Sequence, residues 1–245
     1  MKKTILVLLI IINASCRKEN DTALECLSDC TVVQGRLVTA KGEPLENIPI
    51  EFRHNLGVVI GSSIRRIKKT TTDKNGFYQL KFFIENDELG ANAEGFFQLI
   101  IDYSSLDSEI FMVADPFYDT SIYSLDRRDT TITMDFYNPK KAYITVNLNG
   151  FNPSTEDDYF EIRSLYPVGL KIGENEYINS EYQLGYDGNE SYANSFNTKV
   201  DSVLVAESDF NLISLSKRKN GGEVIDEYHE IFVTENSNEE YNYDY

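Results

Sequence analysis

The chain has 245 residues and carries 23 Lys and Arg against 40 Asp and Glu, which gives a formal net charge of −17 at pH 7. This balance argues against a nucleic-acid partner, because phosphate binding needs clustered Lys and Arg. The length exceeds that of a minimal sandwich and favours two domains of about 100 residues each.

The N-terminus predicts an export signal. Lys2 and Lys3 precede an apolar run from Ile5 to Ile12. This run is too short to span a bilayer, which takes about 18 apolar residues, but it suits the hydrophobic region of a secretory signal. We therefore expect residues 1–15 to be a signal peptide.

The signal is followed by a sequence that predicts lipidation. Residues 13–16 read Asn-Ala-Ser-Cys and resemble the lipobox of bacterial lipoproteins, although Asn13 stands where that pattern usually has an apolar residue. The resemblance implies that Cys16 receives diacylglyceryl and acyl chains such as palmitate, and that these chains anchor the protein in a membrane. The alternative is an ordinary secretory signal cleaved near Ser15.

Residues 16–30 are predicted to form a tether. The charged run from Arg17 to Asp21 resembles the export signal that routes some lipoproteins to the outer face of the outer membrane, and a solvated tether is the equal alternative. We expect a lipid-anchored protein of the bacterial outer membrane. The sequence is compatible with exposure on the cell-surface face and on the periplasmic face.

Two further cysteines favour a disulfide. If Cys16 carries lipid, Cys26 and Cys30 remain as a pair, and exported proteins commonly oxidise such pairs. The closed loop is so short that the chain-entropy model gives about 2 kcal/mol of stabilisation. Two Cys alone do not fill a zinc site, so we expect no metal here.

The dominant pattern is two-residue alternation of apolar and polar residues, which predicts half-buried strands. No segment holds a helical period beyond a turn or two. We therefore predict an all-β fold with two tandem antiparallel β-sandwich domains of the Ig-like or transthyretin-like kind. The alternating apolar sets are Ile48, Ile50 and Phe52; Tyr78, Leu80 and Phe82; Phe97, Leu99, Ile101 and Tyr103; Ile132, Met134 and Phe136; and Ile144, Val146 and Leu148.

The first predicted domain, residues 31–137, carries a recognisable motif order. Its elements are Gln34–Val38, a Gly-x-Pro-Leu turn at 42–45, a second strand at 48–52, and Thr-Asp-x-x-Gly-x-Tyr at 72–78. This order resembles the carboxypeptidase regulatory-like domain, a transthyretin-type (prealbumin-like) sandwich of seven strands. The resemblance implies a structural or interaction module, and it carries no catalytic residues over.

The second predicted domain covers residues 138–235, and its boundary lies at the Asn-Pro-Lys-Lys of 138–141. A hairpin is expected at the Lys-Asn-Gly-Gly of 219–222, because Asn-Gly suits a tight turn. Residues 236–245 are acidic and rich in Tyr, and we predict a frayed tail. The strand candidates are Ala142–Asn149, Tyr159–Leu165, Ser195–Val200, Ser202–Ala206, Asp209–Ser216 and Glu223–Val233.

The sequence contains few residues that suggest a catalytic or metal-binding site. Its two histidines, His54 and His229, fall in different predicted domains, which disfavours a shared metal. A Gly-x-Ser-x-Gly elbow, a Gly-rich phosphate loop and His-Glu-x-x-His are all missing. We expect no enzyme activity, no catalytic residues, no metal and no cofactor.

Three patches have two interpretations each. The basic run Arg65–Lys69 is either a solvated strand edge, which we favour, or a patch for an anionic sugar or lipid headgroup. The oxygen-rich turns at Glu156–Asp158 and Asp187–Glu190 are either solvated loops, which we favour, or Ca²⁺ ligands. The many Tyr are either packing residues, which we favour, or sugar-stacking platforms.

We therefore expect a non-enzymatic cell-envelope lipoprotein that acts as a structural or interaction module at the outer membrane, with envelope proteins or glycans as partners. The alternative is a surface lipoprotein that binds or processes glycans. That alternative requires a cleft with exposed Tyr and a close carboxylate pair around Asp157, Asp158 or Asp187.

Overall fold

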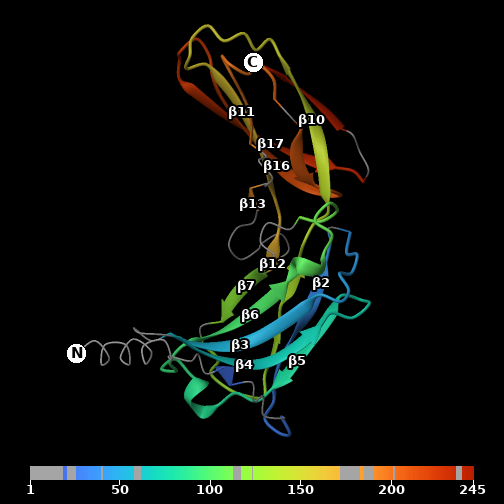
Figure 1. Ribbon diagram of the computed structural model, residues 1–245, viewed down its shortest axis with the longest axis vertical. Coiled ribbons are helices and arrows are strands. Elements are labelled where there is room, and N and C mark those ends of the chain that lie inside the picture. The colour runs from blue at the N-terminus through green and yellow to red at the C-terminus, as the bar shows by residue number, and fades with distance from the viewer. Residues whose placement is uncertain are drawn as a thin grey trace, which may run out of the picture.

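The computed structural model describes residues 19–20, 26–39, 41–57, 62–112, 117–122, 124–171, 183–184, 190–200, 202–235 and 239–245. Within these residues the fold is all-β, with strands throughout and two short 3-10 turns. Two β-sandwiches follow each other along an elongated body (Figure 1). The predicted fold class is therefore confirmed.

The first sandwich packs one sheet of order β1-β4-β3-β6-β7 against another of order β12-β9-β2-β5, with β8 also paired to β2. Most neighbours are antiparallel, but β8 and β9 lie parallel to β2. The bounds are β1 Glu19–Asn20, β2 Thr31–Val38, β3 Pro49–Gly57, β4 Ser62–Thr71, β5 Phe77–Phe82, β6 Phe96–Asp102, β7 Phe117–Ile122, β8 Thr131–Thr133, β9 Asp135–Tyr137 and β12 Gly169–Lys171.

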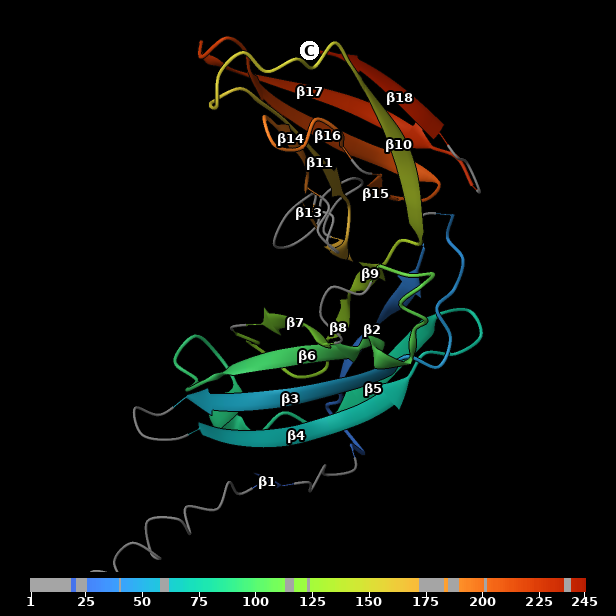
Figure 2. The same cartoon turned by 45° about the horizontal axis from the view of Figure 1, so that its top comes forward.

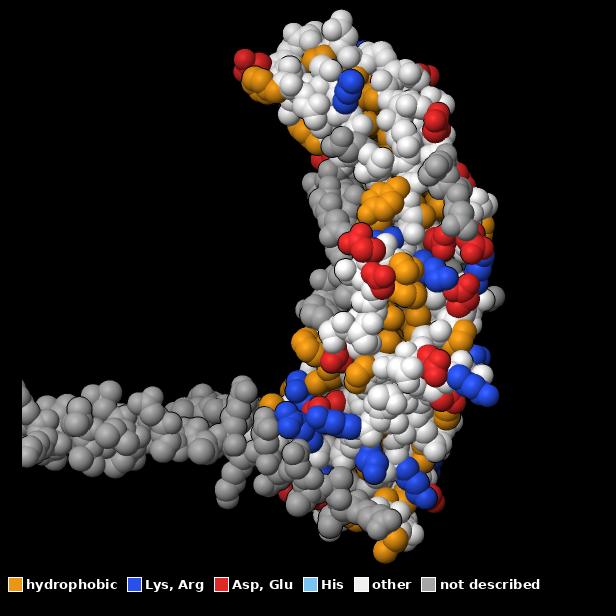
Figure 3. All heavy atoms as spheres, turned by 45° about the vertical axis from the view of Figure 1, so that its right-hand side comes forward, with side chains coloured by type: hydrophobic (Ala, Val, Ile, Leu, Met, Phe, Trp, Pro, Cys, Tyr) orange, Lys and Arg blue, Asp and Glu red, His pale blue; other side chains and the backbone are white. Residues whose placement is uncertain are grey.

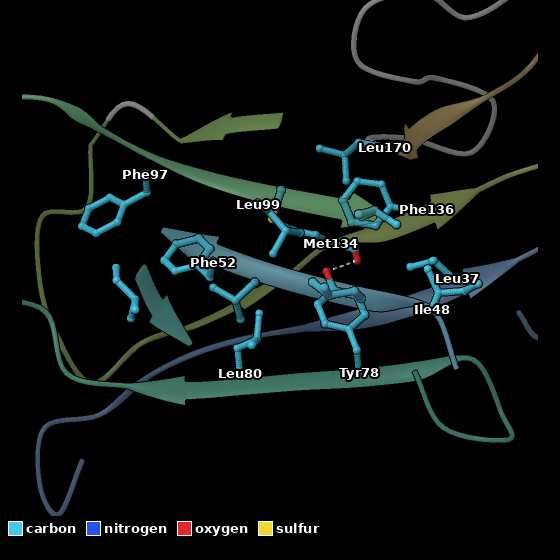
Figure 4. Close-up of a cluster of buried hydrophobic side chains, with 14 of the residues drawn as sticks. Leu37, Ile48, Phe52, Tyr78, Leu80, Phe97, Leu99, Met134, Phe136 and Leu170 are labelled. Atoms are coloured by element: carbon cyan, nitrogen blue, oxygen red, sulfur yellow. Dashed lines mark hydrogen bonds between the residues drawn. The ribbon is translucent and has the colours of Figure 1, made fainter. Parts of the chain in front are cut away.

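Aromatic side chains fill the core between these two sheets (Figure 4). Phe52 from β3 lies between Phe82 and Phe97, with ring centroids 4.7 Å and 5.5 Å away. All three side chains are at most 1% exposed. They come from the alternating positions that the sequence pattern singles out, because alternate residues of a strand face the same side of its sheet.

Gly35 of β2 allows the chain between β8 and β9 to approach closely. Tyr78 of β5 lies opposite Gly35, is 1% exposed, and donates its hydroxyl to the carbonyl oxygen of Met134 at 2.8 Å (Figure 4). A Cβ on Gly35 would lie 1.8 Å from that carbonyl oxygen. The missing side chain thus makes room for a buried hydrogen bond across the core.

The second sandwich packs a sheet of order β15-β10-β18 against one of order β13-β11-β16-β17, with β14 also paired to β11 (Figure 2). Its core includes Ile144, Phe160, Ile162 and Ile213. The bounds are β10 Lys141–Asn149, β11 Tyr159–Tyr166, β13 Gln183–Leu184, β14 Glu190–Asn194, β15 Val203–Ala206, β16 Asp209–Arg218, β17 Val224–Val233 and β18 Glu239–Asp244.

Two predictions for this half are wrong. Residues 239–244, predicted as part of a frayed tail, form β18 and pair in parallel with β10. Tyr241 and Tyr243 pack against the second core, which gives this acidic segment an apolar face to bury. Residues 195–200, predicted as a strand, lie in a turn and coil, where the side chain of Asn194 accepts hydrogen bonds from the backbone of Phe196 and Asn197.

The chain crosses back from the second sandwich to the first. After β11, the chain returns to the first sandwich as β12, which pairs with β9 and buries Leu170 in the first core. A small core of Met112, Tyr166, Leu204 and Ala206 lies at the same junction. The predicted division at residue 137 thus assigns β12 to the wrong sandwich.

Candidate interaction surface

Cys16 and the predicted signal peptide lie outside the described residues, so their roles remain predictions. Of the predicted tether, residues 19–20 pair with β4, so the chain enters along the first sandwich. Cys26 and Cys30 form a disulfide with a Cα–Cα distance of 5.7 Å. Within the described part of the chain, helices long and apolar enough to cross a bilayer are absent.

The two histidines are far apart in the fold. His54 of β3 is 7% exposed, and its Nδ1 lies 3.4 Å from Oε1 of Glu88. Burial lowers the pKa of His54, and the nearby Arg65 adds to this effect. His229 of β17 lies in the second sandwich beside Glu227. No group of three metal-ligating side chains occurs among the described residues.

The basic run lies on β4, which the short strand β1 borders at Ile64 and Arg65. Arg65 donates through Nε to Glu88 at 2.7 Å and also contacts it through Nη2. Arg66 and Lys69 both reach Glu51 of β3, at 3.3 Å and 3.1 Å. These ion pairs bind the run to its own sandwich, although Lys and Arg side chains still gather on the surface of this end of the molecule (Figure 3).

Asp158 organises the acidic loop that the sequence offered as a Ca²⁺ candidate. Its side chain is buried, and its two oxygens accept hydrogen bonds from the backbone of Ser154, Thr155 and Gly221 at 2.7–3.1 Å. The hydroxyls of Ser154 and Thr155 add two more, each at 3.0 Å. The carboxylate therefore ties this loop to the β16–β17 hairpin, which leaves it little capacity to hold a cation.

These hydrogen bonds outweigh the effect of burial on Asp158. Desolvation opposes ionisation and is the largest single influence, but the bonds from Gly221, Ser154 and Thr155 together hold the pKa well below its usual range. A carboxylate whose pKa falls on folding stabilises the fold above its unfolded pKa of about 3.9, and this stabilisation is lost as the pH falls toward the folded value.

We therefore expect Asp158→Asn to lower the free energy of unfolding above about pH 4, and to matter progressively less below it. Its amide group would face donors where the carboxylate now accepts. Urea unfolding over a pH series checks this, with the exposed neighbour Asp157→Asn as the matched control. Equal effects of the two variants at every pH would contradict the assigned role of Asp158.

The second sandwich has a groove along the second half of β10, beside residues 198–200 and Asn242 of β18. Its volume is about 520 Å³. Neither Asp157 nor Asp158 lines it, and the described residues of its lining include no carboxylate. Residues 185–189, including Asp187, lie outside the described residues. The groove is lined by Thr145, Val146, Asn147, Leu148, Asn149, Thr198, Lys199, Val200 and Asn242.

The most exposed set of apolar side chains lies on and beside β17, and the sequence prediction missed it as a surface. Tyr228 is 62% exposed, Ile225 is 50% and Phe232 is 46%. Phe210 of β16 packs edge-on against Phe232, with ring centroids 5.1 Å apart. Tyr228 and Phe232 lie on one face of β17, and Ile225 lies on the other. The sequence predicted a strand here, but it did not show which of its side chains stay uncovered.

No family model matches the chain, and no curated protein matches it. Solved structures with an overall similarity include a streptococcal ancillary pilin, at 15% identity and a TM-score of 0.30. The match covers 90% of this chain and 63% of the pilin, so the chain spans less than two thirds of that protein.

Two other similar structures are of different kinds. The shaft pilin SpaA of Lactobacillus rhamnosus GG is 11% identical, with a TM-score of 0.30, over 86% of this chain and 96% of that one. The 3-chlorocatechol 1,2-dioxygenase of Rhodococcus opacus 1CP is 14% identical, with a TM-score of 0.28, over 51% and 63%. Because all three TM-scores are this low, we draw no inference from these similarities.

Proposed function

We propose that the chain is a non-enzymatic lipoprotein of the bacterial cell envelope. In this proposal Cys16 carries the lipid in the outer membrane, and the two sandwiches act as a spacer that presents an interaction surface. The residue pattern around Cys16 supports the anchor, and the disulfide between Cys26 and Cys30 suits an oxidising compartment.

The joint between the sandwiches carries the spacer proposal. The backbone N–H of Leu170 in β12 donates to the hydroxyl of Tyr118 at 3.1 Å, and Tyr137 donates its hydroxyl to Asp209 across the junction. Lys140 pairs with Glu43 beside these contacts. A joint with a strand that crosses back into the first sandwich, a small core and these polar links favours two sandwiches that move together.

The entry point of the chain gives the spacer a direction. The strand nearest to the proposed anchor, β1, pairs with β4 of the first sandwich. In Figure 2, β1 and the second sandwich lie at opposite ends of the molecule. A lipid on Cys16 would therefore leave the second sandwich as the end far from the membrane.

The use of the polar side chains supports a non-enzymatic role. Asp158 is enclosed by hydrogen bonds, and His54 lies buried beside Glu88 and Arg65. Neither group faces the groove on the second sandwich. Catalysis needs a reactive group within hydrogen-bond reach of a substrate, and these side chains are committed to structure instead.

A hydrolase panel on the purified full-length chain tests this role. We expect no turnover of ester, peptide, phosphate or glycoside substrates, together with a circular dichroism spectrum typical of β-sheet. Turnover that follows the chain through two purification steps, or a strong helical signal, would contradict the proposal. A heat-denatured sample provides the blank for each substrate.

A further inference from the structure

β17 forms a border of the second sandwich, beside which no other described strand pairs. β17 pairs with β16 over its ten residues, without a bulge, and none of the described strands pairs with its other side. Every second residue of an edge strand directs its backbone N–H and C=O away from the sheet. This border therefore offers a row of hydrogen-bonding groups to another strand.

β17 has only one of the usual protections of an edge strand, which is the charge of Asp226, Glu227 and Glu230. It has no Pro, no Lys and no Arg, and its ten residues pair regularly with β16. Natural proteins generally shorten, bend or charge such an edge to prevent strand addition. The exposed side chains of Tyr228 and Phe232, which share one face of β17, give an added strand apolar surface to cover.

Two carboxylates on the outer face of β17 have no cationic partner among the described residues. Asp226 and Glu230 flank Tyr228 at alternate positions, and their neighbours across β16 are Ser216 and Leu212. Neither carboxylate forms an ion pair within the part of the chain that the structure describes. Glu227 on the other face differs, since it pairs with Lys217 at 3.0 Å.

In the first sandwich, an acidic residue of one strand is paired with basic residues of the neighbouring strand. Glu51 of β3 lies directly opposite Lys69 of β4, and their charged groups are 3.1 Å apart. Arg66 reaches the same carboxylate. Opposite charges at facing positions stabilise neighbouring strands, and like charges there destabilise them. On the side of β17 that faces away from β16, no described strand supplies such a cation.

We propose that β17 binds an extended cationic segment of a partner protein by strand addition. The segment would place Lys or Arg beside Asp226 and Glu230, four residues apart, with an aromatic or β-branched residue beside Tyr228 between them. Main-chain hydrogen bonds would give affinity, and the two charges would select the partner. This inference rests on the proposed role as an interaction module and names its partner class.

Fluorescence anisotropy with two labelled peptides tests the proposal on the full-length chain in detergent. The probe is Thr-Lys-Val-Tyr-Val-Lys-Thr, which reads the same in both directions, and the control peptide has Glu at both Lys positions. We expect the Lys peptide to bind about tenfold more tightly at low salt, because two attractive pairs replace two repulsive ones. The difference should shrink at about 1 M salt.

A charge-reversal variant locates the binding to β17. Asp226→Lys with Glu230→Lys should invert the preference, so that the Glu peptide binds more tightly. The matched control is Glu46→Lys with Asp126→Lys, which changes the net charge equally at exposed positions of the first sandwich and should retain the original preference.

Several results would overturn the strand-addition proposal. These are equal binding of both peptides, binding of neither, or a preference that the β17 variant leaves unchanged. A stable dimer through β17 that blocks both peptides would also overturn it and would assign this edge to a second copy. Each of these outcomes leaves the non-enzymatic role to be decided separately by the hydrolase panel.

Discussion

Replacing Gly35 with Ala should destabilise the first sandwich by more than about 4 kcal/mol, or prevent it from folding. The new Cβ would lie 1.8 Å from the carbonyl oxygen and 2.5 Å from the carbonyl carbon of Met134. Both are backbone atoms, so no side-chain rotation relieves the clash. Moving that segment away would also break the hydrogen bond from Tyr78.

A second glycine provides the control for this prediction. Gly42 has φ +74° and no atom within 4 Å of an added Cβ, so Gly42→Ala should cost only the left-handed backbone strain of about 1–2 kcal/mol. Thermal and urea unfolding compare the two variants. If Gly35→Ala unfolds at the same midpoint as Gly42→Ala, the close approach of Met134 to β2 is wrong.

Leu170→Ala should destabilise the first sandwich by about 2–5 kcal/mol. This holds although residue 170 comes shortly after β11, a strand of the second sandwich, in the sequence. Leu170 is 5% exposed and packs within the first core near Phe136 (Figure 4). Its truncation leaves a cavity at the only described strand that the second half of the chain contributes to the first sandwich. The two sandwiches should then also become less firmly joined.

Distance measurements between spin labels on Lys74 and Asp157, one in each sandwich, check the second effect. The distribution should be narrow in the parent chain and broader in Leu170→Ala. Leu106→Ala, which removes a partly buried leucine packed on the same core, is the control and should leave the distribution narrow. An unchanged distribution in Leu170→Ala would show that β12 does not join the sandwiches.

The residues that suggested a regulatory-like domain have a structural explanation. Gly35 and Tyr78, which lie in separate motifs, face each other across β2 and β5 and together hold the carbonyl of Met134. Asp73 and Gly76 close the turn before β5, where Asp73 accepts from the backbone N–H of Asn75 and Phe77 at 2.8 Å and 3.0 Å. Strands with clear alternation were therefore predictable, because local pattern and packing agree there.

The missed elements lack that local agreement. β12 has three residues and forms a strand because it pairs with β9. This pairing joins residues that are far apart in the sequence. β18 is acidic, so its composition hid two tyrosines that share a buried face. The candidate site on β17 was harder to predict than these strands. It depends on whether another described strand pairs with the outer side of β17, and the residues of β17 itself do not show this.

Metabolic labelling with an alkyne analogue of palmitate, followed by membrane fractionation, tests the central claim most directly. In a bacterial host, the parent chain and a Cys26→Ala/Cys30→Ala variant should both incorporate the label and fractionate with the outer membrane. Cys16→Ala should lose all incorporation. Continued labelling of Cys16→Ala, or an unlabelled parent chain, would contradict the lipoprotein account.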